Sequence, residues 1–73
     1  MSSEQILLDR RYNYLPWRFV WRGAAHYVCK IERAWSAHGW LRRPRHYFRV
    51  RCLDDQVYDI FQDVGLNAWF VKR

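Results

Sequence analysis

The chain has 73 residues, a formal net charge of +6 and a sequence pI of about 9.9. This length allows one domain, residues 1–73, and buries only about 60% of the unfolded surface, so the core needs large side chains. The five Trp, five Tyr and four Phe meet that need first, because each buried ring removes about 150–250 Å² from water.

The sequence excludes several classes of protein. No apolar run reaches the length of about 20 residues that spans a membrane, and no signal peptide is recognisable. We therefore expect a cytoplasmic protein in which Cys29 and Cys52 are reduced and buried in the core.

The N-terminal third predicts two strands. Residues 1–5 are expected to be disordered, the core to cover about residues 16–71, and the apolar run Ile6–Leu8 to form a first edge strand. The segment Trp17–Arg22 alternates with period two, which is typical of a half-buried strand. Its inward face is expected to carry Trp17, Phe19 and Trp21, and its outward face Arg18, Val20 and Arg22. A tight turn follows at Gly23 with Ala24 and Ala25.

The segment from His26 to Trp35 predicts a long strand, with a helix as the competing interpretation. We expect a bend or bulge near Glu32–Ala34. One face is expected to be apolar and the other polar: Tyr27, Cys29, Ile31 and Trp35 against His26, Val28, Lys30 and Glu32.

A loop is expected over residues 36–44, and three strands after it. The strand 45–52 directs Phe48, Val50 and Cys52 inward and Tyr47, Arg49 and Arg51 outward. Strands at Val57–Gln62 and Ala68–Val71 follow, each preceded by a hairpin loop rich in Asp, Gly or Asn. The pattern predicts a mostly-β fold: a small antiparallel meander or an SH3-like or Tudor-like barrel of four to six strands. Its core is expected to include Trp17, Phe19, Trp21, Trp35, Phe48 and Trp69.

Four segments with a distinctive composition follow one another along the chain: Pro16–Gly23, 45–51, Val57–Asp63 and Trp69–Val71. Together they resemble a small bacterial domain family of unknown function, with an Arg-Phe-x-Trp-Arg-Gly strand, a Tyr-Tyr-Arg-Val strand and a closing Trp-Phe strand. The pattern also resembles the C-terminal tail of the polymerase-like repair protein ImuB. The resemblance implies an accessory module near DNA repair or replication and supplies no catalytic residues.

A run of cations is the strongest local feature. No acidic residue occurs from Ala34 to Leu53, and arginines beside a ring can hold phosphates and stack a base. The candidate nucleic-acid-binding residues are Arg42, Arg43, Arg45, Tyr47, Arg49 and Arg51. The alternative for Arg49 and Arg51 is intramolecular pairing with Asp59 and Asp63 on the next strand.

Other chemistry has less support in the sequence. A zinc site from His26, Cys29, His46 and Cys52 lacks paired spacing. No nucleophile elbow or glycine-rich phosphate loop occurs, so we expect no enzyme, cofactor or metal.

Two functions remain open. The first is a module that binds nucleic acid, single-stranded rather than duplex, or that works beside a repair or replication protein. The second is a protein-interaction module, self-associating in one variant, that docks through Trp40, Leu41 and an open strand edge.

Overall fold

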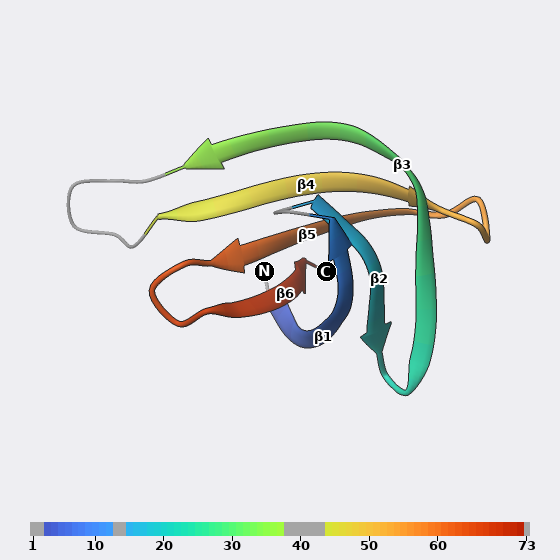
Figure 1. The fold of residues 1–73 in the computed structure, drawn as a ribbon, viewed down its shortest axis with the longest axis horizontal. Helices are drawn as coiled ribbons and strands as arrows, with labels where there is room; N and C mark the ends of the chain where they lie inside the picture. The colour runs from blue at the N-terminus through green and yellow to red at the C-terminus, as the bar shows by residue number, and fades with distance from the viewer. Residues whose placement is uncertain (1–2, 13–14, 38–43, 73) are drawn as a thin grey trace.

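The computed structural model describes residues 3–12, 15–37 and 44–72, which form six β-strands (Figure 1). They are β1 (Ser3–Tyr12), β2 (Leu15–Trp21), β3 (Ala24–Ala37), β4 (Arg45–Cys52), β5 (Val57–Asp63) and β6 (Ala68–Lys72). Each strand pairs antiparallel with the next, and β6 pairs with β1, so the sheet closes into a barrel. The predicted small, mostly-β antiparallel barrel is confirmed, with six strands.

Closure gives β1 two neighbours, β2 and β6, where the sequence predicted an edge strand. We expected disorder through residue 5, yet Ser3–Gln5 pair with residues 70–72 of β6. Closing a barrel removes the unpaired backbone groups that an edge strand would expose. The N-terminal strand is therefore part of the barrel wall.

Three tight connections use residues with positive φ. The β2–β3 turn places both Arg22 (φ 53°) and Gly23 (φ 76°) in the left-handed region, the geometry that matches the twist of a two-residue hairpin. Asp55 (φ 64°) and Asn67 (φ 52°) serve the β4–β5 and β5–β6 turns. Short polar side chains tolerate this region better than other non-glycine residues.

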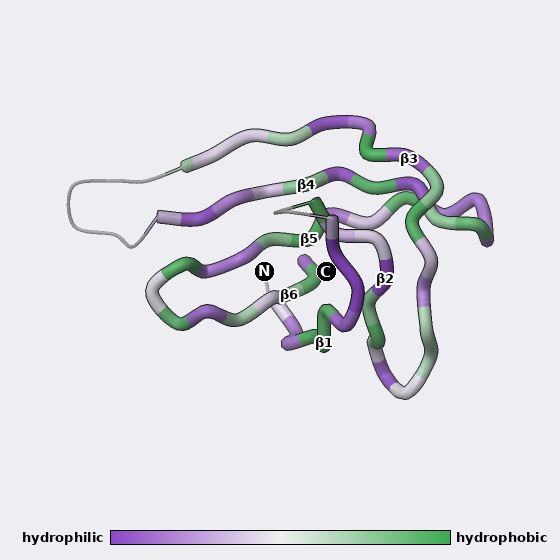
Figure 2. The backbone as a smooth tube through the Cα atoms, in the orientation of Figure 1, coloured by the Kyte–Doolittle hydropathy of each residue, from purple (hydrophilic) through white to green (hydrophobic). Residues whose placement is uncertain are grey.

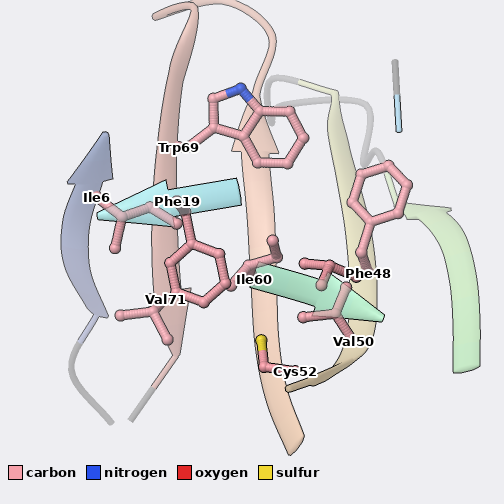
Figure 3. Packing of buried hydrophobic residues seen from close by; sticks show 9 residues of the cluster. Ile6, Phe19, Phe48, Val50, Cys52, Ile60, Trp69 and Val71 are labelled. Atoms are coloured by element: carbon pink, nitrogen blue, oxygen red, sulfur yellow. The ribbon is translucent and has the colours of Figure 1, made fainter. Parts of the chain in front are cut away.

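The core fills the barrel around Phe19, which is 0% exposed (Figure 3). The buried cluster draws on all six strands: Ile6, Phe19, Val28, Phe48, Val50, Cys52, Ile60, Trp69 and Val71. Of the rings predicted to lie inside, Phe19, Phe48 and Trp69 are confirmed, and Trp21 packs against the cluster from a partly buried position. The prediction is wrong for Trp17, which is 42% exposed, and for Trp35, which lies on the outer face of the sheet.

The faces predicted for β3 are wrong in its first half. Val28 is buried and His26 is half-buried, whereas Tyr27 and Cys29 are exposed. The inward parity of β3 is therefore the reverse of the prediction, and Cys29 is not a core cysteine. Both cysteines are free, and only Cys52 is buried.

Register irregularities explain the changing parity of β3. Against β4 the register shifts between Val28 and Lys30 and again between Ile31 and Arg33. An extra residue at such a point sends the following side chains to the other face. The second shift adjoins the bulge that was predicted near Glu32–Ala34, and the long strand itself is confirmed over the helix.

Candidate nucleic-acid interface

The outer face of β4 carries the predicted site residues that the structure describes. Arg45, Tyr47, Arg49 and Arg51 alternate with inward-facing Phe48, Val50 and Cys52, as predicted from period two. Figure 2 shows the matching alternation of hydrophilic and hydrophobic residues along β4. The remaining candidates, Trp40, Leu41, Arg42 and Arg43, lie outside the described residues.

Arg49 is engaged within the barrel wall. Its Nε donates to Asp59 Oδ1 at 2.8 Å and its Nη2 donates to Asp59 Oδ2 at 3.2 Å, a bidentate pair across the β4–β5 register. The hydrogen bond to Asp59 raises the pKa of Arg49, and the same bond lowers the pKa of Asp59. Intramolecular pairing, one of the two alternatives left open by the sequence, therefore holds for Arg49.

Arg51 is also paired, although with other partners than the sequence suggested. Its Nε donates to Glu32 Oε2 at 2.9 Å and its Nη1 to Asp55 Oδ1 at 3.1 Å. These hydrogen bonds, to Glu32 first, raise the pKa of Arg51. Asp63, the second predicted partner, instead lies 3.9 Å from Arg45 Nε.

Four rings cross the outer face of four successive strands. This aromatic row consists of Trp35, Tyr47, Phe61 and Phe70, which are cross-strand partners in the β3–β4, β4–β5 and β5–β6 registers. The ring centroids of Trp35 and Tyr47 are 5.4 Å apart and nearly parallel at 8°. The next centroid distances are 5.3 Å from Tyr47 to Phe61 and 5.2 Å from Phe61 to Phe70.

Cations lie over the rings of the row. The guanidinium carbons of Arg33 and Arg45 are 4.9 Å from the ring centroids of Trp35 and Phe61. Lys72 Nζ lies 5.8 Å from the Tyr47 centroid. Such contacts are attractive by about 0.5–1 kcal/mol at exposed sites, so a ligand can displace them at small cost.

Exposure differs along the row. Phe61 is only 4% exposed, whereas Trp35, Tyr47 and Phe70 are half-buried. A hollow of about 440 Å³ lies at this end of β3 and β4, but most of its lining belongs to the other face of the sheet, since Ala34, Ser36, His46 and Phe48 alternate with Trp35 and Tyr47. Among the described residues Trp35 has Tyr47 as its ring partner, so the row ends at its largest ring.

Sequence reasoning found one ring of the row and missed three. Tyr47 was a candidate, but Trp35 was assigned to the core, and Phe61 and Phe70 were given no role. Parity was the available signal for Phe61, since the adjacent Ile60 is 0% exposed and faces inward. The lateral alignment of the rings depends on register, which period two does not fix.

Cations on this face are not all neutralised by neighbours. Among the described residues, Lys30 and Arg33 have no ion pair with a carboxylate. Lys72 contributes to lowering the pKa of Asp59, although the hydrogen bond from Arg49 is the larger cause. The available positive charge thus lies around the aromatic row, on Arg33 and Lys72.

Metal ligation has no support within the described ranges. Over residues 3–12, 15–37 and 44–72, no group of three or more His, Cys, Asp or Glu side chains is arranged to hold a metal ion. A serine–histidine contact also occurs on β3 and β4, where Ser36 Oγ and His46 Nδ1 are 2.9 Å apart.

Within residues 3–12, 15–37 and 44–72 no helix is long and apolar enough to cross a membrane.

The geometry defines a class: a closed six-stranded antiparallel barrel with a cation-flanked aromatic row on its outer wall. Comparison with protein-family models, curated proteins and solved structures found no match. The resemblance to the bacterial domain family and to the ImuB tail stays a prediction.

Proposed function

We propose that this chain binds single-stranded nucleic acid on the outer face of β3–β6, with bases on the aromatic row and phosphates on its flanking cations. The observation that carries the proposal is the row itself, four aligned rings with cations over three of them. Aromatic rings beside a basic groove are the common means of holding single strands without sequence preference.

The open end of the row is the expected first contact. One face of Trp35 packs on Tyr47, and Arg33 lies over the Trp35 ring. A base that replaces Arg33 at this ring would free its guanidinium for a neighbouring phosphate. The lost contact between Arg33 and the Trp35 ring would then be offset by a bidentate contact between Arg33 and the phosphate.

The paired arginines have a supporting part in this proposal. Arg49 and Arg51 already satisfy carboxylates, and a phosphate would have to compete with Asp59, Glu32 and Asp55. Arg33 and Lys72 are the more available cations, and Arg45 follows them, since its ion pair with Asp63 is long at 3.9 Å. Among the earlier candidates, Arg45 and Tyr47 are thus the residues on which the proposal places most weight.

The choice of single strands follows from what the face offers. Ring faces can be used only by bases whose own faces are open, which excludes bases inside a duplex. A cytoplasmic location is proposed on sequence grounds alone, and work beside DNA repair or replication on the resemblance alone.

The experiment is fluorescence anisotropy of labelled oligothymidine of about 15 nucleotides at about 50 and 200 mM salt. Trp35→Ala is expected to weaken binding by about 1–3 kcal/mol, the usual contribution of one stacked base. Arg33→Gln is expected to lower the slope of log affinity against log salt by about 1. Absence of binding by the unmodified chain at about 50 mM salt would overturn the proposal.

Arg22→Gln is the matched control. Arg22 is exposed and also lies over a ring, 4.9 Å from the Trp21 centroid, but it is ion-paired with Glu4 and sits in the β2–β3 turn away from the aromatic row. The control makes the same change in net charge and is expected to leave affinity unchanged within about twofold. An equal loss in both arginine variants would assign binding to overall charge and not to the row.

Protein interaction remains the second candidate because of one observation on β3. Its described residues after Tyr27 pair only with β4, so the other edge of β3 is unpaired there. A partner strand could add to that edge, an association with weak salt dependence. Trp40 and Leu41, the predicted anchors, lie outside the described residues, and Trp40→Ala in a pull-down from cell extract tests them.

A further inference from the structure

Two bulges face one another in the β1–β2 ladder. Strand β1 has one extra residue, Asp9, and β2 has one extra residue, Trp17, one ladder step further on. Between them Arg10 lies opposite Arg18. Bulges bend a strand and redirect a side chain, and they are over-represented next to functional sites.

The bulge in β2 explains the exposure of Trp17. Simple alternation places Trp17 on the same face as Phe19, which is 0% exposed, yet Trp17 is 42% exposed. It has no ring partner among the described residues. A large aromatic side chain held out of the core in this way has its faces available to a ligand.

Two of the three arginines near Trp17 are unpaired among the described residues. Arg10 and Arg11 are exposed and have no ion pair or hydrogen-bond partner among the described side chains. Arg18 differs, since it is held by an ion pair with Asp9 and lies 5.3 Å over the Tyr27 ring. This contrasts with Arg49 and Arg51, whose donors are taken by carboxylates.

The four residues Arg10, Arg11, Trp17 and Arg18 are called the bulge site. With Asp9 they line an open hollow of about 840 Å³. Figure 2 shows the second half of β1 as a continuous hydrophilic stretch, in contrast to the alternation along β4. Three arginines against one carboxylate, lining the same hollow as an exposed indole, match a nucleotide better than an apolar partner.

We propose that the bulge site is a second contact for the same single-stranded nucleic acid, an inference that rests on the proposed function. Trp17 stacks a base, and Arg10 and Arg11 bind phosphates. The strand order of the closed barrel places β1–β2 across from β4–β5. A bound strand must therefore wrap around a barrel whose two smaller extents are 23 and 22 Å.

This arrangement predicts a dependence on length. A strand long enough to reach both sites binds the second one intramolecularly, which raises affinity without any new contact. A short strand occupies one site at a time. For an oligothymidine of about 30 nucleotides, Arg10→Gln with Arg11→Gln should weaken binding about tenfold and lower the salt slope by about 2. For about 8 nucleotides the loss should be smaller than about threefold, since the aromatic row remains.

The matched control adds the same change of charge elsewhere. Gln56→Glu with Leu66→Glu lowers the net charge by the same amount at two exposed turn positions. We expect the control to lose less than about threefold with the long strand. An equal loss in the control and in the arginine variant would overturn the inference.

A direct readout separates this inference from the proposed function. The indole N–H resonances of Trp17 and Trp35, assigned with Trp17→Phe and Trp35→Phe, are followed as the long oligothymidine is added. Shifts at both support both sites. Shifts at Trp35 alone overturn the bulge site and leave the proposed function standing, shifts at Trp17 alone overturn the aromatic row, and shifts at neither overturn both. Binding to vesicles of anionic phospholipid that needs Arg10 and Arg11, without oligonucleotide binding, would likewise overturn the inference.

Discussion

Replacing Phe61 by alanine tests whether the outer wall of the barrel holds a packed layer of its own. The ring is 4% exposed although it lies outside the buried cluster of the barrel interior. Its contacts are the rings of Tyr47 and Phe70, at 5.3 and 5.2 Å, and the guanidinium of Arg45 at 4.9 Å. The stability of this layer decides whether the aromatic row is prearranged for a ligand.

The magnitude follows from burial and ring contacts. Burying a Phe side chain contributes about 1.5–3 kcal/mol, and each ring pair adds about 0.5–1.5 kcal/mol, not fully additively. The cavity contribution is small because the flexible Arg45 can move into the space. We expect Phe61→Ala to lower the free energy of unfolding by about 3 kcal/mol. A chain of 73 residues has a free energy of unfolding of roughly 4–11 kcal/mol. The variant should therefore still fold at low temperature.

The assay is urea unfolding followed by tryptophan fluorescence, with two reference variants. Ile60→Ala, the next residue on β5 and 0% exposed inside the barrel, should cost about 2–5 kcal/mol. Leu53→Ala, at 73% exposure, should stay within about 0.5 kcal/mol. If Phe61→Ala cost no more than Leu53→Ala at an unchanged m value, the outer rings would not stabilise the fold and the reasoning would be refuted.

Two further predictions concern titration and thiol reactivity. Burial raises the pKa of Cys52 from 9.0 to about 12 and, together with the hydrogen bond to Asp54, that of Tyr58 from 10.0 to about 12. The folded state thus keeps both protons longer than the unfolded state, so this stability is full below about pH 9 and is lost as the pH rises towards 12. The urea midpoint should fall between about pH 9 and 11, and less steeply in Tyr58→Phe; a flat profile would contradict the assignment. Exposed Cys29 should react with iodoacetamide in the folded protein, whereas Cys52, at 2% exposure, should react only after unfolding. Mass spectrometry of single-cysteine variants checks this, and labelling of Cys52 at the rate of Cys29 would argue against the burial.

What the sequence determined by itself was local. Period two along 45–52 correctly divided β4 into an inward face with Phe48 and Val50 and an outward face with Arg49 and Arg51, because pleating alone sets that alternation. The glycine after Arg22 marked the hairpin turn, since a left-handed conformation there needs no tertiary contact. The regular spacing of alternating segments and turn residues was enough to predict a small antiparallel barrel of short strands.

Tertiary structure decided where the strands met and how far each was shifted. One added residue in β2 turned Trp17 outward, and shifts against β4 exchanged the faces of Val28 and Cys29. Register also brought four rings into one row: Trp35, Tyr47, Phe61 and Phe70. It made Glu32, and not Asp63, an ion-pair partner of Arg51. A change of one residue in register moves a side chain to the other face while leaving the local pattern intact, so only the assembled barrel selects among the alternatives.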